Sequence, residues 1–427
     1  MVINYNQIIA EQREELSIIE KQGWVPRDDE GLVNTDSRLV QIITGVRRSG
    51  KSTLAHRALQ GTLYAYINFD DERLMELSPA DLDKLLEALY AVYGEFNRLV
   101  LDEIQNVDGW HLFVNRLLRN EIKIVVTGSN SKLLSREMAT HLTGRFALVE
   151  LLPFSFREFL FSKKVESMEM VTAKNKGLLF GYFEQYMDKG GFPEIATGEP
   201  KRTYITTLFE AIVSHDIIYR YKIRHVRSFR DMAIWLTSNY GTEISYNRLK
   251  NIFGLGSDNT AKNYISYLEE AWLIICLPKF SFKKQETLRY RKVYLIDTAF
   301  SSITGVVSTP NLGRLLENIV FLELFRRRLA LNYELFYFKK VIEVDFVIYG
   351  NRQVLELIQV SLTLTDPKTR KREIRALMVA AKELSPLKMS IVTLNEKQEL
   401  KEDGKIIRVI PVTEWLLESV EKNKWVK

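Results

Sequence analysis

The chain has 427 residues, 46% of them hydrophobic and 27% charged. This length exceeds what a single hydrophobic core usually serves and predicts about three folding units, and the ordinary balance of apolar and charged residues excludes long disordered stretches. A total of 60 Lys and Arg against 54 Asp and Glu gives a net charge of +6, which permits a nucleic-acid partner without requiring one.

The cysteine content and the amino-terminal sequence indicate the cellular compartment of the protein. The single cysteine, Cys276, excludes an internal disulfide and a cysteine-rich zinc site, and it favours a reducing environment. The first residues lack a basic region followed by an apolar one, and no apolar run approaches the ~18 residues that suggest a membrane span. We therefore expect a cytoplasmic protein that does not enter a membrane.

The amino-terminal half begins with a helical extension and continues with alternating strands and helices. Residues 1–35 form the extension, in which Ile8 to Lys21 carry apolar positions at helical spacing. From residue 36 to 155, short and nearly continuous apolar runs are separated by helical segments, as parallel strands covered on both faces require. We expect strands at 40–44, 63–68, 98–102 and 122–127 in a doubly wound α/β sheet.

A glycine-containing loop follows the first of these strands. The pattern Gly45-x-x-x-x-Gly50-Lys51-Ser52 stands between a strand and a helix, where its backbone N–H groups can cradle phosphates. Lys51 can reach the terminal phosphates and Ser52 can hold Mg²⁺, whereas a turn without a ligand is the weaker alternative. We predict a site for ATP and Mg²⁺ whose nucleotide-binding residues are Gly45, Arg47, Arg48, Ser49, Gly50, Lys51, Ser52 and Thr53.

Two adjacent carboxylates, Asp102 and Glu103, end the strand at 98–102. Phosphoryl transfer needs charge neutralisation and an in-line nucleophile more than covalent chemistry. Asp102 is expected to orient the magnesium ion through water, and Glu103 to polarise the attacking water. The alternative is a carboxylate pair that only caps a strand.

Small polar residues follow the strand at 122–127. Asn130, or Ser129 beside it, is placed to sense the γ-phosphate, because ligands of open α/β sheets bind at the carboxyl ends of the strands; both residue types are also common in turns. Arg145 has two interpretations, an arginine finger that reaches the nucleotide of a neighbouring subunit or a surface salt bridge.

The motifs in their order resemble one family. GVRRSGKSTL, YINFDDERL, LVLDEIQNVDGW, TGSNSKLLSREMATHLTGRF, LLPFSFREFL and GGFPEI are together similar to the prokaryotic AAA-type ATPases that carry an uncharacterised carboxyl-terminal domain. The resemblance covers most of the chain from residue 36. It implies that Lys51 and Ser52 bind nucleotide and magnesium, that Asp102 and Glu103 are the Walker B pair, and that Asn130 is near the sensor position. The chain also resembles the archaeal and signal-transducing ATPase branch, whose members often work as switches.

Helical periodicity replaces the strands after Pro153 and predicts a helical lid at 156–228. At 229–285, two helices joined by a glycine-containing turn and followed by an apolar strand from Trp272 to Pro278 indicate a winged helix-turn-helix.

The second helix of that motif carries the candidate nucleic-acid-binding residues Asn259, Lys262 and Asn263, which are placed to contact phosphates or base edges. The same helix carries Glu269 and Glu270, which would repel phosphate if they faced it. DNA binding and a scaffold role for protein contacts therefore both stay open.

The last segment, 286–427, carries Glu317 in an apolar helix, Asp345 on a strand, and Gln359 and Ser361 on the next strand. This order is similar to PD-(D/E)xK nucleases, in which acidic residues and a lysine hold a metal and activate water. Gln359 stands where the second metal-binding carboxylate belongs, and Ser361 stands where the lysine belongs. A neutral amide binds a hard cation weakly and serine supplies no positive charge, so we expect a nuclease-like fold retained for binding or assembly.

The leading hypothesis is an ATPase switch whose state is communicated to the winged-helix and nuclease-like domains. The alternatives are a nucleotide-regulated DNA-binding protein and a nuclease of genome maintenance or defence. DNA, a second copy of the chain and an unidentified protein all remain open as partners.

Overall fold

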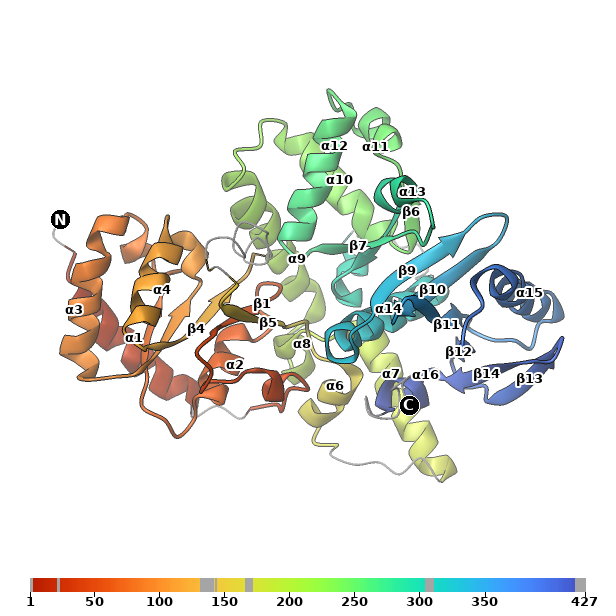
Figure 1. Ribbon diagram of the computed structural model, residues 1–427, viewed down its shortest axis with the longest axis horizontal. Helices are drawn as coiled ribbons and strands as arrows, with labels where there is room; N and C mark the ends of the chain where they lie inside the picture. The colour runs from red at the N-terminus through yellow and green to blue at the C-terminus, as the bar shows by residue number, and fades with distance from the viewer. Residues whose placement is uncertain are drawn as a thin grey trace. The chain divides into compact units, whose positions relative to one another are not determined.

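The computed structural model describes residues 3–20, 24–130, 142, 144–165, 172–303 and 311–418. The contacts within the chain divide it into two compact units. Figure 1 shows the chain coloured from red at its N-terminus to blue at its C-terminus. Met1–Pro153 and the short segment Glu270–Trp272 make the first unit, and Phe154–Glu269 and Leu273–Lys427 make the second. None of the helices in the described part of the chain is long and apolar enough to cross a membrane.

The first unit contains a five-stranded, all-parallel sheet in the order β2-β3-β4-β1-β5. Its strands are β1 (Val40–Thr44), β2 (Ala65–Asn68), β3 (Arg98–Asp102), β4 (Lys123–Gly128) and β5 (Phe146–Glu150). Its helices are α1 (Tyr5–Glu20), α2 (Lys51–Ala58), α3 (Leu82–Tyr93) and α4 (Trp110–Arg119), with short 3₁₀ turns at η1 (Glu30–Leu32), η2 (Glu72–Leu74), η3 (Pro79–Asp81) and η4 (Ile104–Asn106). The doubly wound parallel sheet and its four expected strands are confirmed, and β5 is an additional edge strand.

Helices cover both faces of this sheet, which explains why its strands carry apolar residues on both faces. Leu99 and Leu101 of β3 pack into the core that α1, α3 and α4 share, whereas Val100 between them packs into the core beneath α2. Because successive strand residues point to opposite faces, an unbroken apolar run supplies both cores. All strands being parallel, their carboxyl ends meet at one edge of the sheet, where the loop after β1 lies.

The second unit begins with helices, as expected for the segment 156–228. They are α6 (Phe156–Ser162), α7 (Ala173–Lys189), α8 (Pro193–Thr197), α9 (Lys201–Ala211) and a π-helical continuation, η6 (Ile212–Tyr219). Asp297 fixes the turn between α7 and α8: its carboxylate accepts hydrogen bonds from the backbone N–H groups of Gly191 (2.7 Å) and Ala299 (2.8 Å). Gly190 has φ +77°, and a Cβ there would lie 1.8 Å from the Asp297 carboxylate. The GGFP sequence is therefore a packing requirement.

A small antiparallel sheet in the order β6-β8-β7 follows. Its elements are α10 (Val226–Ser238), β6 (Thr242–Ile244), α11 (Tyr246–Phe253), α12 (Asp258–Glu270), β7 (Ile274–Pro278), α13 (Lys284–Arg289) and β8 (Arg291–Leu295), with η7 (Thr298–Ser302) after it. β8, which follows the boundary expected at 285/286, pairs with both β6 and β7. Pairing between distant strands, which local periodicity does not encode, decides where this sheet ends.

The remaining residues build a six-stranded mixed sheet in the order β13-β14-β12-β11-β10-β9. Its elements are α14 (Leu312–Leu331), β9 (Glu334–Lys339), β10 (Glu343–Gly350), β11 (Gln353–Val360), α15 (Pro367–Leu384), β12 (Lys388–Thr393), β13 (Gln398–Glu402), β14 (Lys405–Pro411) and α16 (Val412–Leu417). β9, β10 and β11 are antiparallel neighbours, and β11, β12 and β14 run parallel. The apolar face of α15 packs on this sheet.

Candidate functional site

The loop between β1 and α2 needs both of its glycines. Gly50 has φ +92°, a left-handed conformation that glycine adopts without a steric penalty. A Cβ at Gly45 would lie 2.0 Å from the backbone carbonyl oxygen of Leu151, just after β5. The edge strand β5 therefore supports the start of the loop, and no side chain fits between them.

Arg27 supports the same loop from the segment before η1. Its guanidinium donates hydrogen bonds to the carbonyl oxygens of Ser49 (2.7 Å) and Leu152 (2.6 Å). Arg47, within the loop, pairs with Asp70 at 3.1 Å. The sequence had indicated Arg47 as a nucleotide-binding residue but not Arg27, which stands in no motif.

Lys51 is the first residue of α2 and its side chain is folded into the site. It is 4% exposed, and its ammonium donates to the carbonyl oxygen of Val46 (3.1 Å) and lies 3.7 Å from the Glu103 carboxylate. A buried ammonium at the amino end of a helix, beside the backbone amides of the loop, is the arrangement that binds an anion. The structure thus brings Lys51 and Glu103, as expected, to one place.

Asp102 ends β3 and is held by hydroxyl groups. It accepts hydrogen bonds from Ser52 (3.0 Å), from Tyr66 of β2 (3.0 Å), and from Thr127 of β4. Burial, and then the neighbouring Glu103, raise the pKa of Asp102. The two expected magnesium-site residues, Ser52 and Asp102, are therefore in direct contact.

Glu103 adopts a left-handed backbone conformation, with φ +52°, which aims its side chain across the sheet edge. Its carboxylate accepts hydrogen bonds from the backbone N–H (3.1 Å) and hydroxyl (3.0 Å) of Ser129, and from Gln105. Burial alone would raise the pKa of Glu103, but the Lys51 ammonium and these hydrogen bonds outweigh it and hold the pKa below its ordinary value. Glu103 is therefore an ionised base at neutral pH.

Of the two sensor candidates, it is Ser129 that contacts Glu103. Asn130 is buried at the same edge, and its carbonyl oxygen accepts a hydrogen bond from the Thr44 hydroxyl at 3.3 Å. Part of the motif between Asn130 and Arg145 lies outside the described residues. Tyr66 and Thr127, which hold Asp102, were not singled out from the sequence, although both stand in the family-like motifs.

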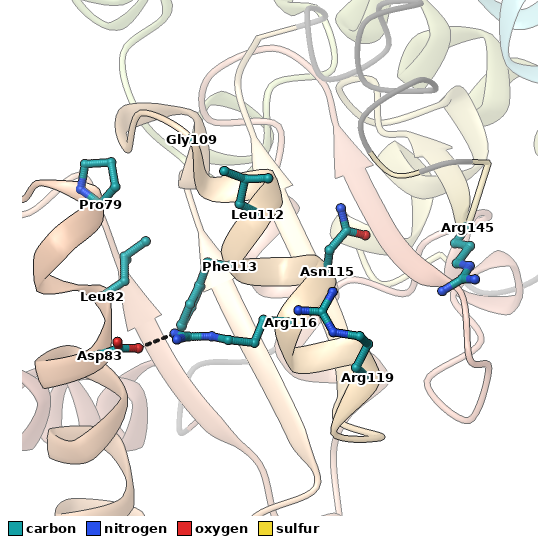
Figure 2. A pocket seen from close by; sticks show the side chains of 10 residues that line it. All are labelled: Pro79, Leu82, Asp83, Gly109, Leu112, Phe113, Asn115, Arg116, Arg119 and Arg145. Atoms are coloured by element: carbon teal, nitrogen blue, oxygen red, sulfur yellow. Dashed lines mark ion pairs between the residues drawn. The ribbon is translucent and has the colours of Figure 1, made fainter.

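Arg145 is at the opposite end of the sheet from this cluster. It precedes β5, whose first residue Phe146 pairs with Val40 at the start of β1, whereas the phosphate loop follows the end of β1. Figure 2 shows Arg145 facing a cavity of about 570 Å³ with Arg116 and Arg119 of α4. The structure therefore does not bring Arg145 to the nucleotide site of its own chain.

Trp272 is an unexpected neighbour of the phosphate loop. With Glu270 and Ala271 it groups with the first unit, and its indole N–H donates to the Thr44 hydroxyl at 3.3 Å. Trp272 has φ +59°, and β7 begins only at Ile274, so the expectation of a strand from Trp272 is wrong by two residues. Thr44 directly precedes Gly45 of the loop.

The candidate nucleic-acid contacts Asn259, Lys262 and Asn263 are all exposed near the start of α12. Glu269, on the same helix, is turned to the sheet: it accepts a hydrogen bond from the backbone N–H of Cys276 (3.0 Å) and pairs with Arg291 (3.6 Å). Arg291 thus partly neutralises the Glu269 carboxylate, which is turned away from the exposed Asn259, Lys262 and Asn263.

In the mixed sheet, Gln359 binds the backbone. Its carbonyl oxygen accepts from the N–H of Asp345 (3.1 Å), and its amide donates to Glu373 of α15 (2.6 Å). Ser361 donates to the carbonyl oxygen of Thr363. Within the described ranges, no group of three His, Cys, Asp or Glu side chains is arranged to hold a metal ion.

Comparison with protein families assigns three segments. Residues 37–160 match the family described as AAA domain, residues 181–306 match a domain of unknown function, DUF8612, and residues 312–415 match another, DUF4143. The first match covers the whole phosphate-loop cluster.

Relatives match along nearly the whole chain. An uncharacterized protein of Methanocaldococcus jannaschii is 34% identical over 419 residues, which are 94% of this chain and 93% of that protein. An uncharacterized protein of Haemophilus influenzae is 29% identical over 400 residues, 90% of this chain and 95% of the relative. Among solved structures, a signal transduction ATPase with numerous domains and a tetratricopeptide repeat sensor, from Pyrococcus horikoshii, is 16% identical with a TM-score of 0.28, over 71% of this chain and 46% of the other.

Proposed function

Since the chain belongs to the family of the uncharacterized Methanocaldococcus jannaschii protein and carries an AAA domain at residues 37–160, we propose that it hydrolyses ATP with Mg²⁺ and uses the nucleotide state as a conformational switch. The observation that carries the proposal is the convergence of Lys51 and Ser52 from α2 with Asp102 and Glu103 from the end of β3 onto one edge of the sheet.

Each of these residues has a distinct role. Lys51 and the loop amides bind the phosphates, and Ser52 and Asp102 are the residues that would hold a magnesium ion. Such an ion would supply charge neutralisation for the transferred phosphoryl group. Glu103 takes the proton of the attacking water, a step that contributes about 10²–10⁴-fold to rate in enzymes.

The Lys51–Glu103 contact gives the switch a physical basis. The ammonium lies 3.7 Å from the carboxylate, and a triphosphate competes for the same ammonium. When Lys51 pairs with phosphate, Glu103 loses its cationic partner and becomes more basic, while Ser129 and Gln105 still donate hydrogen bonds to its carboxylate. Nucleotide binding thus activates the base that hydrolysis needs.

In this proposal, Trp272 transmits the nucleotide state beyond the ATPase unit. Trp272 follows α12 and precedes β7, and its indole N–H donates to Thr44 at the start of the phosphate loop. A change in the loop therefore acts on the short segment that joins α12 to β7. Arg145 serves as an arginine finger in this proposal only in an assembly of two or more copies, because it stands at the far end of its own strand.

We assign the segment from α10 to β8 as a winged helix and the segment from α14 to α16 as a nuclease-like domain without nuclease activity. The sheet order β6-β8-β7, with α11 and α12 joined by a glycine turn, supports the first assignment. The hydrogen-bonded Gln359 and Ser361 support the second. The exposed Asn259, Lys262 and Asn263 favour a second candidate function, nucleotide-regulated DNA binding.

Mg²⁺-dependent phosphate release from ATP tests the enzyme proposal in the wild type, Lys51→Ala and Glu103→Gln. Lys84→Ala and Glu95→Gln are matched controls, because both side chains are exposed and away from the site. We expect both site variants to lose most of the activity and both controls to keep it. Equal rates in all five proteins would rule out this site as the catalytic centre.

A further inference from the structure

The mixed sheet carries a cavity with basic walls. It has a volume of about 1030 Å³ and is lined by the start of α14, the neighbouring ends of β10 and β11, and one face of α15. Lys368, Lys371, Arg372 and Arg375 of α15 all line it, and their spacing of i, i+3, i+4 and i+7 places them on one helix face. At a rise of about 1.5 Å per residue, they form a cationic row roughly 10 Å long.

These cations are available to a ligand. Lys368, Lys371 and Arg375 are exposed, and Arg314 faces the same cavity from α14. Within the described part of the chain, the side chains of Lys368, Lys371 and Arg375 make no ion pair. A row of unneutralised charges around a cavity repels itself, so an anionic occupant would relieve that repulsion.

The floor of the cavity is acidic, and a buried ammonium neutralises part of its charge from within. Lys292 of β8, which is 2% exposed, places its ammonium 3.1 Å from Glu317, 2.5 Å from Glu343 and 3.8 Å from Asp345. Glu317 also accepts a hydrogen bond from the Tyr294 hydroxyl at 2.6 Å. One ammonium thus occupies the centre of three carboxylates.

Lys292 stays charged in this position. Burial would lower its pKa, but the carboxylates of Glu317, Asp345 and Glu343 outweigh burial and raise it. The fourth acid of the cavity, Glu373, is paired with Arg372 and accepts from Gln359. A divalent cation would have to displace an ammonium that is fixed in the protein, so the floor has little need for a metal ion.

The composition of the lining indicates what the cavity takes. None of the lining residues is aromatic, so the cavity has no platform on which unpaired bases could stack. A row of cations along one helix face fits an extended polyanion, and a nucleic-acid strand carries one charge per about 3.4 Å of helix axis. These properties favour the backbone of a duplex over single strands and over small nucleotides.

We propose that this cavity binds the phosphodiester backbone of duplex nucleic acid without cutting it, and that the Lys292 ammonium takes the place that a divalent cation would hold. The cations of α15 contact the phosphates, and Lys292 reduces the repulsion that the carboxylates of the floor would exert on them. Binding is thus independent of magnesium and independent of sequence. The inference concerns the second unit alone and stands whether or not the first unit hydrolyses ATP.

Fluorescence anisotropy of the full-length protein with labelled duplex DNA, duplex RNA and single-stranded DNA tests the proposal, without nucleotide, in EDTA and in Mg²⁺. The test variant is Lys371→Glu with Arg375→Glu. The control, Lys382→Glu with Lys401→Glu, changes the net charge equally at exposed positions that do not line the cavity. We expect the test variant to bind duplex at least about tenfold more weakly and to show a salt slope smaller by about 2.

The same assay contains the outcomes that would overturn the proposal. These are equal weakening in the control variant, binding that requires Mg²⁺, preference for single strands, or a degraded duplex after incubation. Loss of binding in Lys262→Glu with none in the test variant would place the site on α12 instead. The DNA and RNA arms identify which duplex is bound, and ATP hydrolysis measured separately on each variant shows whether the first unit is intact.

Discussion

Acidification should weaken the ATPase unit through one buried histidine, His56 of α2. The imidazole is 3% exposed; its Nδ1 lies 3.1 Å from the Tyr64 hydroxyl, and its Nε2 has no hydrogen-bond partner in the described part of the chain. Its ring also packs edge-on against Tyr66, 4.8 Å between centroids, and Tyr66 binds Asp102. Protonation would place an unpaired charge directly behind the magnesium site.

The direction and the size of this change in folding stability with pH follow from the pKa of His56. Burial lowers the pKa of His56 from 6.5 to about 4, so between these values the unfolded chain binds a proton that the folded chain does not. Stability is therefore lost as the pH falls from 6.5 towards 4. At about 1.36 kcal/mol per pKa unit, the loss is about 3 kcal/mol by pH 4, of which about 2 kcal/mol is lost by pH 5.

Calorimetric unfolding of the wild type and of His56→Phe at pH 7 and pH 5 measures this contribution. Phenylalanine fills a similar volume without titrating, and the other titrating groups are common to both proteins. The wild type should lose about 2 kcal/mol more than the variant over this interval. An equal loss in both proteins would refute the assignment of the pH dependence to His56.

Three further perturbations have defined outcomes. Gly50→Ala forces a Cβ into a left-handed conformation at φ +92° and should cost about 1–2 kcal/mol, seen as a lower melting temperature together with weaker nucleotide binding; full binding would show that the loop tolerates the side chain. Lys292→Met leaves the buried carboxylates without their ammonium partner, so it should lower the free energy of unfolding of the second unit by about 3–5 kcal/mol. Denaturant titration measures this loss, and a change under about 1 kcal/mol would mean that the cluster is hydrated. Trp272→Phe removes the hydrogen bond to Thr44 and should change the ATP hydrolysis rate while leaving the melting temperature within a few degrees; an unchanged rate would exclude Trp272 from the coupling.

The sequence predicted the local features of the ATPase unit because each is encoded over a few residues. A short, nearly continuous apolar run such as 98–102, between helical segments, indicates a strand covered on both faces, and Gly50 with Lys51 and Ser52 has one structural context with a mechanism. The carboxylates at the end of β3 followed from the same order of elements. Local pattern and tertiary structure agree in this part of the chain.

Contacts between distant residues were not predictable in the same way. β5 carries an apolar run at 146–149 but is only partly buried, and its place in the sheet is set by pairing with the distant strand β1. Arg27, Trp272 and Lys292 contact their sites from 22, 228 and 25 residues away, respectively, and no spacing rule connects such positions. The pairing of β8 with the distant strand β6 was not predictable for the same reason.

Direct binding of ATP is the measurement on which the account depends most. Titration calorimetry of the full-length protein with ATP and Mg²⁺ should give saturable binding in the wild type and in Lys84→Ala. Lys51→Ala should bind at least about tenfold more weakly, because it lacks the buried ammonium beside the loop amides. Undetectable binding in the wild type, or equal affinity in Lys51→Ala, would contradict the assignment of this loop as the nucleotide site.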